Sequence, residues 1–452
     1  MVSNQDNSTG TNRRQFLKTS AGIGLAGLGL LSTSGSVAAV ETSDADRWTR
    51  AEAANITLTN DTTAPLIQEN SESISDDYWI WDTWPLRNRD GSIVKINGWQ
   101  IVFSLTAPDD LVPGARHNEA TIRYFYSRDG QSWQEGGQAF EAPLGHHQWA
   151  GSAMYDQDEE QIYHFYTAVS SFPEFRQRPA LAIGSSIETG PQGVELTGEQ
   201  EHVIMGTPDG ELYQTLEQSR EQGIVYAFRD PWYFQHPETG EDLVVFEANT
   251  PTGSKDPGNP QSFNGNIGVM RATNDELTEW ELLPPVLEAI GTNQQLERPH
   301  FVFNDGKWYL FTISHKFTFA PGLEGPDGLY GFVSDSMYGD YEPLNEGGLV
   351  IANPEEAPFQ AYSWLAMPHG DNALVESFEN FRGLDDTSRG SISLDEVGYL
   401  PPEEQKELFG GTLAPSLKLQ LDGAETRIVT EFNDGHFLPS GGSSGKGPKQ
   451  SR

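Results

Sequence analysis

Lys307-Trp308-Tyr309-Leu310-Phe311 is one of four similar stretches that decide the predicted fold of this chain. The others are Trp99-Gln100-Ile101-Val102-Phe103, Gln161-Ile162-Tyr163-His164-Phe165-Tyr166 and Leu243-Val244-Val245-Phe246. Each follows a turn that contains Gly, Asp or Asn and is rich in aromatic and β-branched side chains, which is typical of a β-strand. Apolar residues at helical spacing are scarce in the rest of the chain. We therefore predict an all-β fold.

The spacing of these stretches favours one all-β architecture in particular. They begin near residues 99, 161, 242 and 307, roughly 60 to 80 residues apart. A β-propeller whose blades are four-stranded sheets gives a repeat of this kind. A β-sandwich also consists of short strands joined by turns, so the pattern alone leaves both architectures open.

The charge balance excludes several classes of partner. The 452-residue chain holds 28 Lys and Arg residues, nine of them Lys, against 66 Asp and Glu residues, for a net charge of −38. Such a surface repels phosphate backbones and anionic lipids, so we expect no nucleic-acid or membrane partner. An acid excess with few lysines is expected of a protein that works in concentrated salt, where the charges are screened. An ordinary acidic secreted protein is the alternative. The chain has no Cys, which excludes disulfides and thiolate metal sites.

The two ends of the chain are predicted to lie outside the folded domain. Asn12-Arg13-Arg14-Gln15-Phe16-Leu17-Lys18 precedes an apolar run over residues 21–31 and then Val37-Ala38-Ala39. This pattern is typical of a twin-arginine export signal, and the run is too short to span a bilayer. We assign residues 1–39 to the signal, 40–440 to one folded domain and 441–452, which are rich in Gly, Ser and Lys, to a disordered tail. The product is predicted to be extracellular.

Acidic residues are too numerous here for a site to be identified by counting. Candidates are therefore sought among aromatic, Pro or Arg neighbours, where a carboxylate is costly unless it is paired or used. The first is Asp82, within Trp79-Ile80-Trp81-Asp82-Thr83-Trp84-Pro85-Leu86. Three tryptophans around one acid favour a sugar ring stacked on indole, with the carboxylate facing the ring carbon. The alternative is a core strand in which Asp82 caps a turn before Pro85.

Two further segments place an acid next to Arg and Pro. In Phe228-Arg229-Asp230-Pro231-Trp232, adjacent side chains of an extended strand point to opposite faces, so Arg229 and Asp230 are expected to serve different partners. A surface turn fixed by Pro231 is the alternative. In Gln295-Leu296-Glu297-Arg298-Pro299-His300, Glu297 is either a general acid or a salt-bridged loop residue.

Taken in order, these motifs resemble those of one known family. The stretches Trp81-Asp82-Thr83-Trp84-Pro85, Trp149-Ala150-Gly151-Ser152-Ala153, Arg229-Asp230-Pro231, Glu297-Arg298-Pro299 and Asp305-Gly306-Lys307-Trp308-Tyr309-Leu310-Phe311-Thr312 are similar to motifs of the fructansucrases of glycoside hydrolase family 68, the levansucrases and inulosucrases. The similarity runs from about residue 75 to Ala414-Pro415-Ser416. It implies a five-bladed β-propeller with a central funnel-shaped pocket. The implied activity is cleavage of sucrose and transfer of the fructosyl group to a growing fructan or oligosaccharide acceptor, to sucrose or to water. No cofactor is implied, and we expect a monomer.

The resemblance, carried over motif by motif, implies a role for each candidate residue. Asp82 would be the nucleophile, Asp230 the stabiliser that binds fructosyl hydroxyls, and Glu297 the acid/base. The implied substrate-binding residues are Trp81, Trp149, Ala150, Arg229, Gln295, Arg298, His315 and Tyr362. A retaining glycosidase needs one ionised carboxylate to attack and one carboxylic acid to protonate the leaving group, which agrees with these assignments.

Some positions match the branch of the family that is found in Gram-negative bacteria. Ala150 stands where some members have Ser, and His315, expected on the acceptor side of the pocket, stands where some have Arg. The branch with a structural calcium ion has acids at two places that here hold Ile224 and Gln294 or Gln295. No metal site is therefore implied.

Two rival functions stay open on the sequence. A family 32 invertase shares the propeller and the Arg-Asp-Pro motif, but its nucleophile lies in a Trp-x-Asn-Asp-Pro-Asn-Gly context that Asp82 lacks. A sugar-binding propeller without catalytic activity would keep the tryptophans but would not need three carboxylates.

Overall fold

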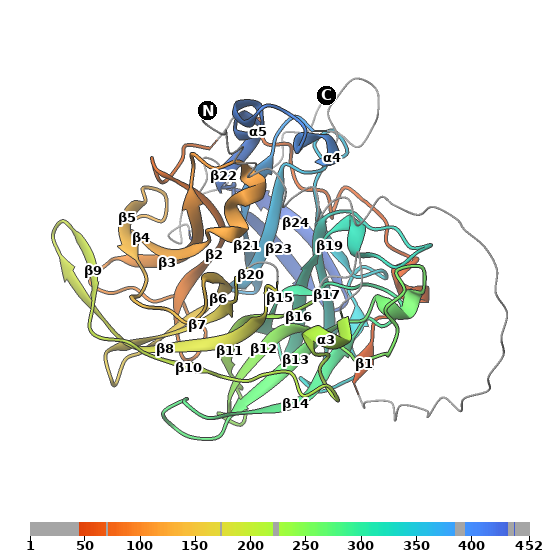
Figure 1. Cartoon of the computed structure of the whole chain (residues 1–452), viewed down its shortest axis with the longest axis horizontal. Coiled ribbons are helices and arrows are strands. Elements are labelled where there is room, and N and C mark those ends of the chain that lie inside the picture. Colours follow the sequence, from red (N-terminus) through yellow and green to blue (C-terminus); the bar gives the residue numbers. More distant parts are fainter. Residues whose placement is uncertain are drawn as a thin grey trace, which may run out of the picture.

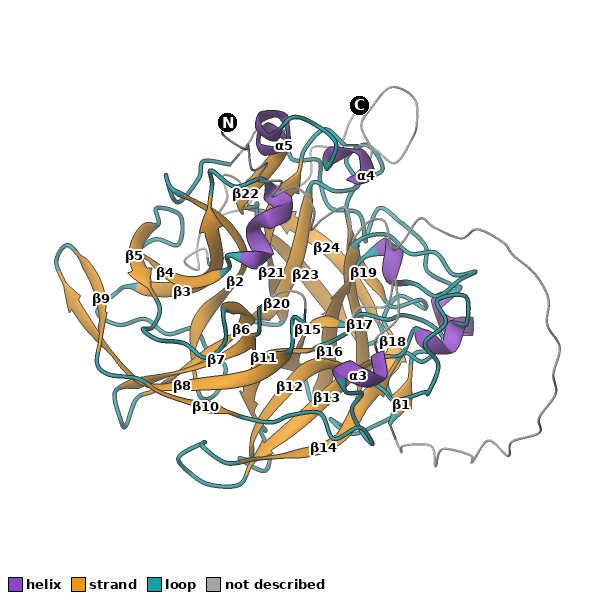
Figure 2. Ribbon diagram, viewed as in Figure 1, coloured by secondary structure: helices purple, strands orange, loops and turns teal. Residues whose placement is uncertain are grey.

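The fold consists mainly of β-strands that radiate from a common centre, and the described helices are short (Figures 1 and 2). The computed structural model describes residues 45–68, 71–171, 174–219, 226–384, 394–432 and 438. The predicted export signal (1–39) and tail (441–452) lie outside the described residues. The prediction of an all-β chain is confirmed.

The described strands form five blades. In each blade, four main strands pair antiparallel and follow the chain from the innermost strand outward, and a short parallel pairing between innermost strands joins blades 1 and 2. Blade 1 holds β2 (Tyr78–Asn88), β3 (Gln100–Pro108), β4 (Thr121–Ser127) and β5 (Gln134–Gln138). Blade 2 holds β6 (His147–Asp156), β7 (Gln161–Val169), β8 (Gln177–Gly190) and β10 (Glu201–Ile204), with β9 (Gly193–Thr197) also on β8. Blade 3 holds β11 (Phe228–Gln235), β12 (Asp242–Asn249), β13 (Gly265–Ala272), β14 (Trp280–Glu288) and the parallel strand β1 (Asp46–Arg47).

The last two blades follow the same order. Blade 4 holds β15 (Glu297–Asn304), β16 (Lys307–Ser314), β17 (Gly328–Ser334) and β18 (Glu342–Pro343), with β19 (Leu349–Ala352) also on β17. Blade 5 holds β20 (Ala361–His369), β21 (Asn372–Phe381), β23 (Leu417–Asp422) and β24 (Glu425–Glu431), with β22 (Phe409–Leu413) also on β21.

The helices are short connections between strands. The described ones are α2 (Arg50–Ala53), α3 (Leu216–Ser219), α4 (Leu394–Val397) and α5 (Pro402–Leu408), and the 3-10 turns η1 (Pro113–Asn118), η2 (Pro260–Ser262) and η3 (Lys316–Thr318). None of the helices in this part of the chain is long and apolar enough to cross a membrane.

The five innermost strands close into a ring, which distinguishes a propeller from a sandwich of two facing sheets. β2 contacts β6, β6 contacts β11, β11 contacts β15, β15 contacts β20, and β20 contacts β2. These strands gather around the middle of Figure 1. The prediction of a five-bladed propeller is confirmed, and the sandwich is excluded.

The four stretches that decided the predicted fold are second strands of successive blades, namely β3, β7, β12 and β16. The fifth second strand, β21, has the sequence Asn372-Ala373-Leu374-Val375-Glu376-Ser377-Phe378-Glu379-Asn380-Phe381. The sequence pattern did not predict this strand, because Glu376 and Glu379 interrupt its apolar residues. Both Glu376 and Glu379 are nevertheless buried, at 1% and 0% exposure.

Aromatic side chains fill the space between neighbouring blades. Phe165 of blade 2 stacks on Tyr233 of blade 3, with ring centroids 5.0 Å apart. Trp48, next to β1 on blade 3, packs against Tyr330 of blade 4 at 5.4 Å. Because each buried aromatic side chain contributes a large apolar area, these contacts fix the angle between blades and hence the shape of the centre.

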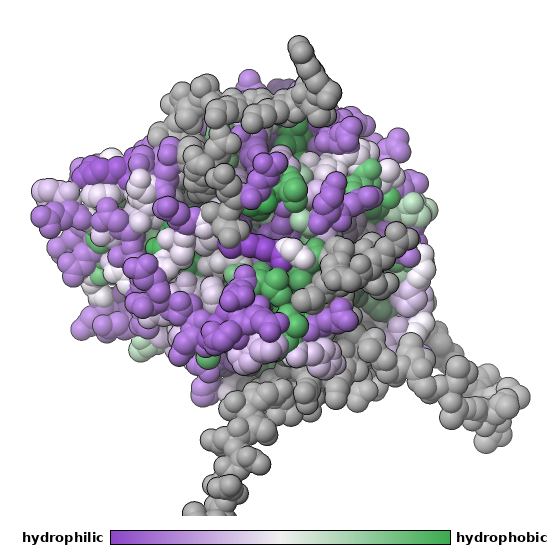
Figure 3. All heavy atoms as spheres, turned by 90° about the horizontal axis from the view of Figure 1, so that it is seen from above, coloured by the Kyte–Doolittle hydropathy of each residue, from purple (hydrophilic) through white to green (hydrophobic). Residues whose placement is uncertain are grey.

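The outer surface matches the acidic composition. On the face shown in Figure 3, hydrophilic residues predominate and hydrophobic ones form small groups between them. The large hydrophobic side chains exposed in the described part of the chain are Leu66, Phe303, Phe317, Tyr338 and Tyr399.

Candidate active site

Each innermost strand carries a β-bulge near its start. The pairing register with the second strand shifts between Trp81 and Trp84 in β2, Trp149 and Ser152 in β6, Arg229 and Trp232 in β11, Glu297 and His300 in β15, and Tyr362 and Leu365 in β20. The first bulge positions hold Trp81, Trp149, Arg229, Glu297 and Tyr362, and the second hold Asp82, Ala150, Asp230, Arg298 and Ser363. Nine of the eleven residues predicted for the site thus occupy equivalent places around the ring.

The bulges hold non-glycine residues in the left-handed backbone region. The φ angles are 51° at Asp82, 60° at Asp230, 47° at Arg298 and 61° at Ser363. Such conformations cost about 1–3 kcal/mol each and persist where the surrounding structure imposes them, often at functional sites. This backbone corrects one prediction: Arg229 and Asp230 do not face opposite ways. Their side chains lie on the same side, with Nε of Arg229 3.7 Å from Oδ2 of Asp230, because the bulge breaks the alternation of an extended strand.

Side-chain hydroxyls pair the backbone groups that the bulges leave without a strand partner. The backbone N–H of Asp230 donates to Oγ1 of Thr167 at 2.9 Å, and this hydroxyl donates to the carbonyl of Ala150 at 3.0 Å. Oγ1 of Thr312 donates to the carbonyl of Glu297 at 2.9 Å. Pro231 follows Asp230 with no N–H to satisfy. Side-chain hydrogen bonds therefore stabilise the bulges of β6, β11 and β15.

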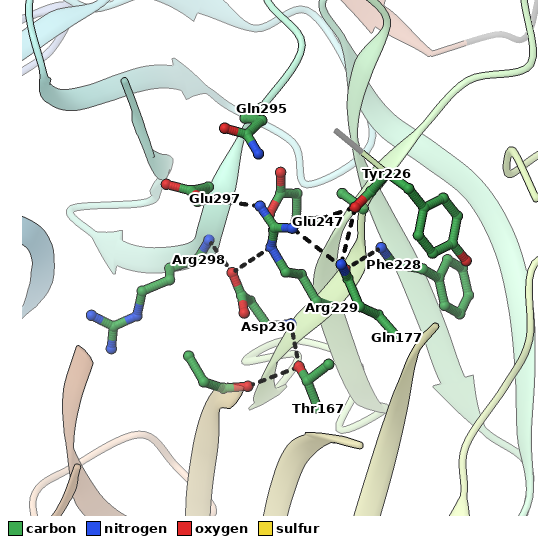
Figure 4. A network of polar contacts seen from close by, with 12 residues as sticks. Thr167, Gln177, Tyr226, Phe228, Arg229, Asp230, Glu247, Gln295, Glu297 and Arg298 are labelled. Atoms are coloured by element: carbon green, nitrogen blue, oxygen red, sulfur yellow. Dashed lines mark hydrogen bonds and ion pairs between the residues drawn. The ribbon is translucent and has the colours of Figure 1, made fainter. Parts of the chain in front are cut away.

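Arg229 connects the acids of blades 3 and 4 (Figure 4). Its Nε lies 2.7 Å from Oε2 of Glu247, which is fully buried, and its Nη2 lies 3.0 Å from Oε1 of Glu297. Its Nη1 faces Oε1 of Gln177 at 3.4 Å. A planar guanidinium with several donors suits this arrangement because it binds two carboxylates in fixed directions.

A second arginine lies behind Asp82. Nη1 of Arg298 donates to the carbonyl and to Oγ of Ser363 at 3.0 and 2.6 Å, and Nη2 donates to the carbonyl of Thr83 at 2.9 Å. The backbone N–H of Arg298 donates to Oδ2 of Asp230 at 3.1 Å. Ser363 also hydrogen-bonds the carboxylate of Asp82. Blades 1, 3, 4 and 5 are thereby joined around one group of charges.

The three predicted carboxylates interact electrostatically. Burial raises the pKa of Asp82 above its ordinary value; Arg298 and the Ser363 hydrogen bond oppose this shift, and the charge of Glu297 adds to it. Burial also raises the pKa of Asp230, to about 6. The charge of Arg229 lowers this pKa, and the charges of Glu297 and Asp82 raise it further. Asp230 is 7% exposed, whereas Asp82 and Glu297 are only partly buried. Two acids thus remain accessible beside a third that the protein encloses.

Blades 4 and 5 complete the surroundings of Glu297. Oη of Tyr362 donates to Oε2 of Glu297 at 2.5 Å. Nε2 of His315 lies 3.9 Å from the same oxygen, and its Nδ1 lies 2.9 Å from Oδ2 of the buried Asp327. Burial lowers the pKa of His315, but the ion pair with Asp327 and the charge of Glu297 raise it to a net value above the ordinary one.

Aromatic residues from blades 1 and 2 form another part of the site. Trp81 is buried and Trp149 is partly exposed. The ring of His117 lies between them, with its centroid 5.7 Å from the ring centroid of Trp81 and 6.2 Å from that of Trp149. Nε1 of Trp149 donates to the carbonyl of His117 at 3.1 Å. The guanidinium of Arg116 lies 5.3 Å from the ring centre of Trp81. These contacts hold the two indoles in place.

The remaining predicted residue, Gln295, lies just before β15. It is buried, and its carbonyl accepts a hydrogen bond of 2.6 Å from Ser314. Figure 4 places its side chain above Glu247 and Arg229.

Sequence reasoning missed Ser363, Glu247 and Asp327. Glu247 had a recognisable signal, because it directly follows the apolar stretch Leu243-Val244-Val245-Phe246 and so was to be expected inside the sheet. Asp327, in Pro326-Asp327-Gly328, has the composition of an ordinary turn. The part of the chain that the structure describes contains no group of three His, Cys, Asp or Glu side chains placed to hold a metal ion.

Most of the chain is similar to known proteins. A family model described as Levansucrase/Invertase matches residues 38–438. An extracellular sucrase from Zymomonas mobilis is 38% identical over 421 residues, covering 88% of this chain and 96% of the relative. A levansucrase from Rahnella aquatilis is 36% identical over 428 residues, covering 87% and 96%. The solved structure of an inulosucrase from Halalkalicoccus jeotgali bound to kestose has a TM-score of 0.83 and 46% identity, covering 89% of this chain and all of that one.

Proposed function

Because this chain belongs to glycoside hydrolase family 68 and is a fructansucrase acting on sucrose, we propose that Asp82, Asp230 and Glu297 carry out its reaction. The observation that supports this most is their position: three inner strands each present one of these acids at a bulge, around Arg229 and Arg298. A core strand or a surface turn, the alternatives for these segments, would not bring the three acids together.

In the first step, Asp82 attacks the anomeric carbon of the fructosyl group of sucrose. A bond forms between that carbon and a carboxylate oxygen, and the bond from the carbon to the glucosyl oxygen breaks. Glu297 gives its proton to the glucosyl oxygen, so that glucose leaves as a neutral molecule. Ser363 and Arg298 favour the ionised form of Asp82, which is the form that attacks.

In the second step, an acceptor hydroxyl replaces Asp82 at the same carbon. Glu297, now ionised, removes the proton of that hydroxyl, and the ester bond to Asp82 breaks. The acceptor is a growing fructan, an oligosaccharide, sucrose or water. His315 lies 3.9 Å from Glu297, and we assign it to the acceptor side.

Asp230 and the aromatic residues bind the fructosyl group. The Asp230 carboxylate is held by the backbone N–H of Arg298 and lies near Arg229, so it can accept hydrogen bonds from fructosyl hydroxyls without moving. Such bonds strengthen as the ring becomes oxocarbenium-like, which lowers the barrier. The partly exposed Trp149 offers indole surface for the sugar ring, and the buried Trp81 adjoins Asp82 in the same bulge.

Incubation with sucrose in concentrated salt tests the function directly. Glucose and fructose are measured separately over time. A transferase releases more glucose than fructose, a hydrolase releases equal amounts, and a sugar-binding protein releases neither. Carbon NMR of the polymer then identifies the linkage, levan through the 6-hydroxyl or inulin through the 1-hydroxyl.

We also propose that the chain is secreted through the twin-arginine pathway and acts as a monomer. A relative that is named an extracellular sucrase supports secretion, and Arg13-Arg14 with the following apolar run supports the route. Replacement of both arginines by Lys should retain the protein in the cell, and light scattering gives the mass of the purified product.

A further inference from the structure

The rings of Tyr362, His315 and Phe317 form a continuous stack that begins at Glu297. Tyr362 contacts Glu297 through its hydroxyl. The ring of His315 lies 4.0 Å from that of Tyr362, with 12° between the planes. The ring of Phe317 lies 4.8 Å from that of His315, with 15° between the planes. Stacked side chains thus lead from the proposed acid/base residue to the protein surface.

The outer member of this stack is open to solvent. Phe317 is 53% exposed, whereas Tyr362 is 7% exposed. One face of Phe317 covers His315, so the exposed part of the ring is available to another planar or weakly polar group. Single exposed hydrophobic side chains are common on protein surfaces. Phe317 differs from them because its ring continues the stack that reaches Glu297.

The stack is held rigidly in its position. Oδ2 of Asp327 lies 2.9 Å from Nδ1 of His315, and Oδ1 of the same carboxylate accepts the backbone N–H of Lys316 at 2.8 Å. Oγ1 of Thr318 donates to the carbonyl of His315 at 2.7 Å, and the carbonyl of Thr318 accepts the N–H of Gln294 at 2.9 Å. The residues on both sides of Phe317 are therefore fixed, and a ligand would not have to order this segment when it binds.

We propose that Phe317 is a binding platform for a second sugar ring of the acceptor. The proposal rests on the proposed function, in which an acceptor hydroxyl reaches Glu297. The first acceptor ring then lies at the edge of His315, and the next ring of an oligosaccharide packs its C–H face on the exposed ring of Phe317. A neutral sugar is not repelled by the acidic surface, and an aromatic face suits it. The platform retains oligosaccharides for further extension.

The test measures how well the Phe317→Ala variant uses kestose as an acceptor. With sucrose as donor and added kestose as acceptor, the conversion of kestose to longer products is followed by chromatography. The apparent KM for kestose should rise about three- to tenfold, as expected for the loss of one aromatic contact, and the polymer should become shorter. Glucose release from sucrose should fall much less. Phe317→Tyr and Phe317→Trp should restore the kestose KM, because they restore the ring.

Tyr338→Ala is the matched control. Tyr338 is also 53% exposed but lies near Glu241 and Arg271 of blade 3, outside the stack, so kestose use should not change. An unchanged kestose KM and product length in Phe317→Ala would overturn the platform. An equal loss of glucose release and transfer would also overturn it, because the effect would then act on cleavage. Failure of the wild-type protein to release glucose would instead contradict the proposed function.

Discussion

Arg229 and Glu297 face each other between blades 3 and 4, with Nη2 of the guanidinium 3.0 Å from Oε1 of the carboxylate. The other oxygen of Glu297 accepts the Tyr362 hydroxyl, and Arg229 is itself anchored on the buried Glu247. The direction of the Glu297 carboxylate is therefore set by groups from the two blades on either side, blades 3 and 5. Precise orientation of an acid/base residue of this kind contributes to catalysis because no reorganisation is needed in the transition state.

Replacement of Asp82 by Ala should abolish sucrose cleavage, because no covalent intermediate can form. Mass spectrometry of a quenched wild-type reaction should show one added fructosyl group, and the variant should show none. Asp77→Ala, which alters an exposed acid ahead of the same strand, is the control. Substantial turnover by folded Asp82→Ala would show that the nucleophile lies elsewhere.

Glu297→Gln should lower kcat by about 10²–10⁴-fold while KM changes little, because the amide keeps the shape but has no proton to give. Steady-state glucose release measures both constants. A fructosyl donor whose leaving group needs no proton should be used far better than sucrose. Glu342→Gln, at an exposed position of blade 4, should behave as wild type. If Glu297→Gln loses as much activity toward the activated donor as toward sucrose, the acid role is wrong.

Ser363→Ala should move the acidic limb of the pH profile to higher pH. The Ser363 hydrogen bond lowers the pKa of Asp82, so its removal raises that pKa, and the attacking carboxylate is protonated at a higher pH. The shift should be about one unit or less. Arg298 keeps its bonds to the carbonyls of Ser363 and Thr83, so the fold should persist.

To test this prediction, kcat/KM of the wild type and of Ser363→Ala is measured across pH at constant salt. The midpoint of the acidic limb is then compared between the two proteins. Ser185→Ala provides a control at a buried serine of blade 2. An acidic limb at the wild-type pH would mean that Ser363 does not act on Asp82.

His315→Ala should increase hydrolysis relative to transfer. Water and sugar compete for one fructosyl-enzyme, so the ratio depends on the difference between two barriers. An imidazole that hydrogen-bonds an incoming sugar lowers one barrier by about 1–2 kcal/mol, which is roughly five- to thirtyfold in the ratio. Free fructose should rise and products should shorten, while initial glucose release falls much less. A wild-type ratio of transfer to hydrolysis would exclude His315 from the acceptor site.

The folded state should depend on salt. The net charge of −38 is screened over about 3 Å at 1 M salt but over about 10 Å at 0.1 M, so repulsion across the surface grows as salt is removed. The melting temperature, followed by circular dichroism, should fall on the order of 10 °C between these salt concentrations. Sorbitol does not screen charge, so adding it at equal osmolality should not restore the melting temperature. A melting temperature independent of salt would contradict adaptation to salt.

Several features followed from the sequence because they depend on local chemistry. The short run of aromatic residues and Leu from Trp308 to Phe311 follows a turn and favours a strand, and all four side chains are buried. The order of the Trp-Asp, Arg-Asp-Pro and Glu-Arg-Pro motifs identified the family, and it predicted nine residues that the structure places at the bulges of the inner strands. The acid excess follows from composition alone. The fifth blade could not be found from the same repeat, because the buried Glu376 and Glu379 conceal its second strand.

The tertiary structure alone decided how these residues act together. A bulge depends on pairing between two strands, so the sequence could not show that Arg229 and Asp230 turn to the same side. The partners Glu247, Ser363 and Asp327 are each within hydrogen-bonding or ion-pair reach of a predicted residue, yet they belong to different strands or turns. Their roles arise only when the ring of inner strands closes. The sequence by itself therefore determined the chemistry of the groups, and the propeller determined their distances, burial and charge environment.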